Sequence, residues 1–137
     1  MGASAERARD DSPAALRRVL AGQTLVGLVL ATFFWAVFGT VAGYSALAGG
    51  LICVIPNAFL ALRLIMPRRD PGAHGLLRAA YAGELGKILL TVLMFSLAFM
   101  WIDPLAAGPL FATFIAAQLA TFAGLLRTAA TIDKQAD

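Results

Sequence analysis

The chain has 137 residues, of which 60% are hydrophobic and 14% are charged, with a mean hydropathy of +0.79 and a formal net charge of +3. A soluble domain carries about a quarter charged residues, so these proportions exclude an ordinary soluble domain and a disordered chain. One cysteine excludes a disulfide framework, and the scattered basic residues do not suit a nucleic-acid module. We interpret the chain as an integral membrane protein, with no enzymatic activity and no cofactor, because no nucleophile–base pair is evident.

Four apolar segments are long enough to cross a bilayer, which takes about 20 helical residues. No charge occurs in the 44 residues between Arg18 and Arg63, so this stretch predicts two spans joined by a turn at 39–43. The dipeptide Asp103-Pro104 separates a third span from a fourth. The spans are expected at residues 19–38, 44–62, 79–102 and 105–126.

The placement of Lys and Arg predicts the orientation, because cytoplasmic connections are enriched in these residues. Ten of the eleven lie before the first span, between the second and third, or after the fourth, and Lys87 lies inside the third span. Both termini and the loop from 63 to 78 are therefore expected in the cytoplasm. The predicted fold is an all-α bundle of four transmembrane helices, made of two hairpins, with a mobile cytoplasmic tail at 1–15 and one membrane domain at 16–137.

A layer of polar side chains is expected in the cytoplasmic half of the bundle. At a rise of about 1.5 Å per residue, each lies roughly 7–13 Å inward from the nearest flanking arginine. Glu84 and Lys87 are three residues apart and can pair on one helix face. These polar side chains either hold the helices together by hydrogen bonds and ion pairs or contact a partner protein. The alternative is a cation or proton site, to which a ring of Glu84 side chains in an oligomer could contribute. Its members are Gln23, Asn57, Glu84, Lys87 and Gln118.

Small residues and one proline mark places where helices approach or bend. Pro56 lies inside the second span, where it removes a backbone hydrogen bond and favours a kink, and Asn57 can satisfy a freed group nearby. Cys53 is interpreted as a small apolar filler. Small faces let backbones approach within one chain or between copies, so a homo-oligomer is possible. The expected close-approach positions are Gly49, Gly50, Gly83, Gly86, Ala116, Ala120 and Gly124.

Three motifs in the second to fourth spans occur in a characteristic order. LAGGLICVIPNAFLALRL at 47–64 contains a Gly-Gly pair and then Pro-Asn, GELGK follows at 83–87, and the last span holds Pro109-Leu110 and Gln118-Leu119. This combination resembles the bacterial ATP synthase protein I family, small membrane proteins encoded at the head of many ATP synthase operons.

The resemblance implies a non-catalytic assembly factor in the bacterial inner membrane. Such a protein would bind c subunits and aid assembly of the c ring, with the lipid bilayer as its other partner and no nucleic acid. The alternative is a magnesium or other cation channel or transporter associated with the ATP synthase. In that case Glu84 would be the metal ligand, and otherwise no metal site is expected. Lys87 favours the assembly factor, because a fixed positive charge repels cations.

Overall fold

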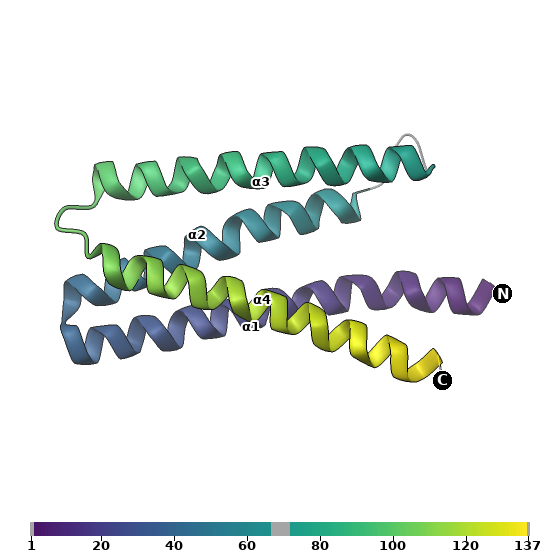
Figure 1. The fold of residues 1–137 in the computed structure, drawn as a ribbon, viewed down its shortest axis with the longest axis horizontal. Coiled ribbons are helices and arrows are strands. Elements are labelled where there is room, and N and C mark those ends of the chain that lie inside the picture. Colours follow the sequence, from purple (N-terminus) through teal and green to yellow (C-terminus); the bar gives the residue numbers. More distant parts are fainter. Residues whose placement is uncertain (1, 67–71, 137) are drawn as a thin grey trace.

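The computed structural model describes residues 2–66 and 72–136, which fold into four helices joined by short connections. All four helices are long and apolar enough to cross a membrane, as the sequence predicts. Figure 1 shows the start of α1, the end of α2, the start of α3 and the end of α4 at the same end of the molecule. The helices are α1 (Gly2–Phe38), α2 (Thr40–Ile65), α3 (Ala73–Trp101) and α4 (Ala107–Ala136).

Several hydroxyl groups inside the spans are satisfied by their own helices. In hydrocarbon an unpaired polar group costs several kcal/mol, so a hydroxyl that donates to the carbonyl one turn earlier removes that cost locally. This lets apolar helices carry serine and threonine without a partner on another helix. Thr24, Thr32, Thr91 and Ser96 donate in this way to the carbonyls of Leu20, Leu28, Lys87 and Val92, each at 2.8 Å.

The turn between α1 and α2 is shorter than predicted. Gly39 alone separates the two helices, with a φ of 91° in the left-handed region that favours glycine. The turn expected at 39–43 is therefore wrong, because Gly43 is helical. An added Cβ at Gly43 would lie 2.6 Å from the Cβ of Trp35, so this glycine lets α1 and α2 pack closely directly after the turn.

The helices extend beyond the predicted spans. α3 begins at Ala73 rather than residue 79, and α4 continues to Ala136 rather than ending at residue 126. α1 begins at Gly2, so the segment 1–15, predicted as a tail, is helical from residue 2, and the part suited to a membrane is Pro13–Phe38. The middle of the predicted cytoplasmic loop, residues 67–71, lies outside the described residues.

α2 lies at the centre of the arrangement. It contacts α1, α3 and α4, and α4 also packs on α1. Within the described part of the chain, α3 packs along α2 alone, and the α3 and α4 backbones diverge from their connection (Figure 1). Phe95 bridges them near that connection, with ring centroids 5.3 Å from Phe111 and 5.1 Å from Phe114. The first predicted hairpin is thus a packed pair of helices, whereas the second is open.

Two adjacent glycines let α2 approach two helices at once. An added Cβ at Gly49 would overlap the carbonyl oxygen of Leu110 on α4 and lie 2.9 Å from its carbonyl carbon. An added Cβ at Gly50 would lie 3.3 Å from the Cα of Gly27 on α1. Neighbouring residues point about 100° apart around a helix, so the pair serves both contacts.

The other predicted small residues differ in their roles. Added Cβ atoms at Gly83 and Gly86 on α3 would lie 2.7 Å from side-chain atoms of Leu60 and Phe59 on α2, so both glycines admit bulky side chains. On α4 the fully buried small residue is Ala117, which we did not predict, whereas Ala116 and Ala120 are half-buried. An added Cβ at Gly124 would lie 3.5 Å from Cγ2 of Val19 on α1, which is an ordinary van der Waals distance.

Polar contacts fasten the start of α2 to the connection between α3 and α4. The hydroxyl of Ser45 accepts a hydrogen bond of 2.9 Å from the amide of Ala106 and donates to the carbonyl of Val41 at 2.6 Å. The hydroxyl of Tyr44 donates to the carbonyl of Pro104. These bonds fix the end of the molecule opposite the termini.

The orientation in the membrane stays a prediction, and surface labelling tests it. In a Cys53→Ala background, a membrane-impermeant thiol reagent added outside intact cells is expected to label Ala107→Cys, at the start of α4 beside the connection that lacks Lys and Arg. Asp133→Cys, near the opposite end, should react only after the membrane is opened. Both positions are exposed. Labelling of residue 133 from outside would invert the predicted topology.

A charged groove as the candidate functional site

A groove with a volume of about 290 Å³ lies between α2, α3 and α4 and brings together Glu84, Lys87 and Gln118, three of the predicted polar residues. Its floor includes Cys53 and Pro56 of α2. We call this site the charged groove. The groove lies where the α3 and α4 backbones diverge, so it is open at the surface of the bundle (Figure 1).

Helical spacing places the α3 side of the groove on one face. Glu84, Lys87, Ile88 and Thr91 line it, and residues three, four and seven apart share a helix face. The Thr91 hydroxyl donates to the Lys87 carbonyl at 2.8 Å, so it offers only an acceptor to the groove. The polar chemistry on this wall therefore comes mainly from the two charged side chains.

Glu84 and Lys87 form a loose ion pair. Nζ of Lys87 and Oε1 of Glu84 are 4.0 Å apart, and the side chains are 19% and 53% exposed, respectively. Lys87 is therefore the more enclosed member of the pair. An ammonium group has three donors, and a carboxylate at this distance does not saturate them. Lys87 can thus bind a further acceptor brought into the groove.

A hydrogen-bonded chain behind the groove joins α2 to α4. The amide nitrogen Nδ2 of Asn57 donates to Sγ of Cys53 over 3.5 Å, and the Cys53 thiol donates to Oε1 of Gln118 over 3.3 Å. Cys53 is therefore more than the apolar filler we expected, because it links two amide side chains on different helices. Asn57 reaches this thiol, and α2 continues as one helix through the buried Pro56.

Gln23 does not belong to the groove. Its side chain is 1% exposed, and its amide nitrogen donates to the hydroxyl of Thr121 across the contact of α1 with α4. The Oε1 atom of Gln23 and the hydroxyl of the buried Thr113 have no hydrogen-bond partner among the described residues. The predicted polar layer therefore divides into a buried α1–α4 link and an open charged groove.

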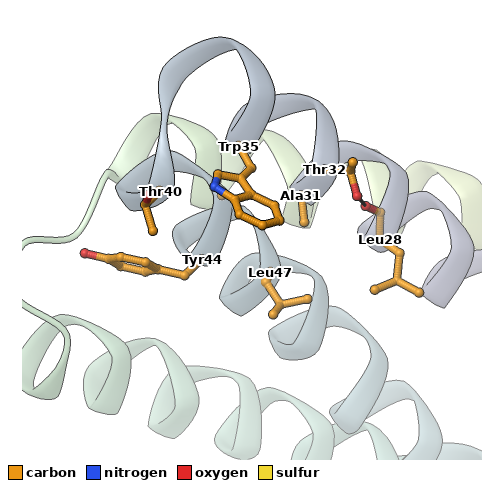
Figure 2. Close-up of a pocket in the computed structure, with 8 residues that line it drawn as sticks. Leu28, Ala31, Thr32, Trp35, Thr40, Tyr44 and Leu47 are labelled. Carbon is orange, nitrogen blue, oxygen red and sulfur yellow. Dashed lines mark hydrogen bonds between the residues drawn. The ribbon is translucent and has the colours of Figure 1, made fainter.

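A second groove of about 290 Å³, between α1 and α2, carries little chemistry. Figure 2 shows Trp35 and Tyr44 bordering it, with Leu28 and Leu47 further along. The Thr32 hydroxyl there is already bonded to the Leu28 carbonyl. Trp and Tyr favour the membrane interface, which suits this end of the molecule. The charged groove is therefore the stronger candidate site.

The described residues offer few metal ligands. Among the residues whose side chains the structure describes, no three His, Cys, Asp or Glu side chains gather in a way that could hold a metal ion. Glu84 is the acidic side chain that lines the charged groove. A divalent cation prefers several oxygen ligands, so a cation site here would need ligands from further copies of the chain.

Comparison with known proteins gives consistent matches over most of the chain. Residues 18–115 match the family model described as "ATP synthase I chain". A protein of Pseudomonas aeruginosa named "ATP synthase protein I" is 41% identical over 98 residues, covering 72% of this chain and 78% of that protein. A Pseudomonas putida protein of the same name is 38% identical over 109 residues, covering 79% and 81% of the two chains. No solved structure matches the chain significantly.

Proposed function

Because this chain belongs to the ATP synthase I chain family, we propose that it is a non-catalytic membrane assembly factor that binds c subunits and aids assembly of the c ring. The observation that carries the proposal is the charged groove, in which Lys87 is enclosed but has donors to spare. The proposed occupant is one helix of a c subunit, a hairpin that carries a carboxyl group within the membrane.

Charge complementarity supports this occupant. Lys87 lies nine residues beyond Arg78, or about 13 Å along α3, which is close to the middle of a hydrocarbon core about 30 Å thick. A charge at that depth is costly unless it is paired. A carboxylate on a partner helix would pair with the ammonium group through a charge-assisted hydrogen bond, stronger than a neutral one.

The helix arrangement also supports a partner in the groove. α1, α2 and α4 contact one another, whereas α3 packs along α2 and meets α4 through side chains near their connection, such as Phe95. A helix placed beside α3 and α4 would cover the groove without breaking the contacts among the other three. The core around Leu110 includes Ala98 of α3, so α3 is anchored near its connection to α4, whereas the groove is lined by the earlier α3 residues 84–92.

Co-purification with a groove-filling variant tests the proposal. A tagged chain is expected to retain c subunits in mild detergent, and Ile88→Trp should lower their recovery at least threefold, because residue 88 lines the groove. Leu89→Trp is the matched control, since Leu89 is the adjacent exposed residue and does not line the groove.

The comparison of these two variants tests whether c subunits bind in the charged groove, and the unaltered chain tests whether they bind at all. Equal recovery with Ile88→Trp and Leu89→Trp would place the contact outside the groove. Absence of c subunits from the unaltered chain, with other membrane subunits retained, would contradict the assembly role itself.

A further inference from the structure

A third cavity lies between α1 and α4 at the end of the molecule where both helices carry their chain termini. Its volume is about 680 Å³, and Arg18 of α1 and Arg127 of α4 line it together with Gln135. Figure 1 shows α1 and α4 crossing and then separating toward this end. The cavity is distinct from the charged groove and lined by different residues.

The lining is cationic. None of the described residues that line the cavity is acidic, and neither guanidinium group has an ion-pair partner among the described residues. A guanidinium group presents a planar fork of donors that matches the oxygens of a phosphate. Two arginines on facing helices, without an ion-pair partner in the described part of the chain, therefore favour an anion with several oxygens.

The neutral polar groups of the cavity add acceptors. Thr128 and Thr131 line it, and their hydroxyls already donate to the carbonyls of Gly124 and Arg127, at 3.0 and 2.9 Å. Each hydroxyl oxygen therefore remains an acceptor. Such acceptors suit a ligand that carries hydroxyl groups beside its phosphate, as a glycerol headgroup does.

The level of the cavity points to a lipid rather than a soluble anion. Arg18 is the last charge before 44 uncharged residues, and Arg127 is the first charge after the 23 uncharged residues 104–126. Both arginines thus stand at the boundary of the hydrocarbon, where phospholipid phosphates lie. Val19 and Gly124 line the inner part of the cavity, where an added Cβ at Gly124 would lie 3.5 Å from Cγ2 of Val19. One turn further inward, Gln23 and Thr121 close the contact of α1 with α4.

We propose that this cavity binds the headgroup of an anionic phospholipid, with its phosphate between Arg18 and Arg127 and its acyl chains directed toward the hydrocarbon. Basic pockets between transmembrane helices bind anionic headgroups in this manner. The lipid would bridge the two helices where their packing ends. This lipid site is independent of the proposed contact with c subunits.

Native mass spectrometry of the purified full chain, titrated with phosphatidylglycerol or phosphatidylcholine, tests the proposal. Phosphatidylglycerol should bind preferentially, and the double change Arg18→Gln with Arg127→Gln should weaken its binding about twenty-fivefold, about fivefold for each arginine. The matched control is Arg17→Gln with Arg78→Gln, which removes the same charge from exposed residues that do not line the cavity. That control should change the affinity less than twofold.

A steric variant separates the cavity from its charges. Ala15→Phe keeps both arginines and fills the cavity, so it should weaken binding of phosphatidylglycerol severalfold. Equal losses in the two double variants, or full affinity in Ala15→Phe, would overturn the proposal. Displacement of the lipid by millimolar glycerol phosphate would reassign the cavity to a soluble anion. If the double variant does not fold, the single variant Arg127→Gln tests the proposal, with an expected fivefold loss of affinity for phosphatidylglycerol.

Discussion

Replacing Gly49 by alanine is expected to lower the free energy of unfolding by about 2–3 kcal/mol, the upper part of the range for overpacking. The new methyl group would overlap the carbonyl oxygen of Leu110, which belongs to a backbone and cannot rotate away. α2 and α4 would have to separate, and Leu110 and Thr113 would lose their close packing. Titration of the purified protein with a denaturing detergent, followed by circular dichroism, measures the change.

Gly22→Ala is the matched control for this substitution. Gly22 lies inside α1, and an added Cβ there meets nothing within 4 Å. Alanine favours helix by about 1 kcal/mol over glycine in water, so this variant should be neutral or slightly more stable. Equal stability of the Gly49→Ala and Gly22→Ala variants would show that the close approach of α2 to α4 is not a feature of the folded protein.

Replacing Lys87 by glutamine is expected to reduce the recovery of assembled c ring by about tenfold to a hundredfold, the range for loss of a charged hydrogen bond. Glu84→Gln should reduce it less, because Glu84 only holds the ammonium group in position from 4.0 Å away. The c ring recovered from membranes that contain c subunits and each variant gives the measurement. Ser96→Ala, an exposed change on α3 whose hydroxyl bonds its own helix, serves as the control.

Magnesium flux into liposomes, measured with the same variants, distinguishes the assembly factor from a channel. For an assembly factor, neither substitution changes the flux. For an ion path, Glu84→Gln should reduce the flux sharply, and Lys87→Gln should raise it by removing a repelling charge. Selective magnesium uptake that depends on Glu84, together with normal c ring assembly in the absence of the protein, would contradict the assembly role.

The number of membrane-spanning helices could be predicted from the sequence because the bilayer restricts what can cross it. A bilayer requires long uncharged helical stretches, and the charges at Arg18, Arg63 and Arg127 delimit them in the sequence. The turn was harder, because Gly39 and Gly43 look alike in a sequence. Gly39 supplies a left-handed residue, whereas Gly43 makes room for Trp35, and that difference exists only once α1 packs on α2.

The sequence predicts how deep each polar residue lies in the membrane, but it does not predict which neighbouring helix each side chain faces. Counting residues from the flanking arginines places Gln23 about 7–8 Å and Gln118 about 13 Å inward in the same half of the bundle. It does not say that Gln23 faces α4 through Thr121, while Gln118 faces α2 through Cys53. Those directions depend on the rotation of each helix about its axis, which packing determines. The same limit explains why Ala117, rather than Ala116, is the small residue buried on α4.

The position of α4 has a consequence for biosynthesis. Leu110, Thr113 and Ala117 of this last helix are fully buried, and α4 packs on both α1 and α2. When the first three helices have left the ribosome, Gly49 still faces lipid and Gln23 still lacks Thr121. The core can therefore close only after the final helix enters the membrane. Until then, the polar side chain of Gln23 lacks its partner on α4. Insertion of α4 into the membrane is therefore the step that completes folding.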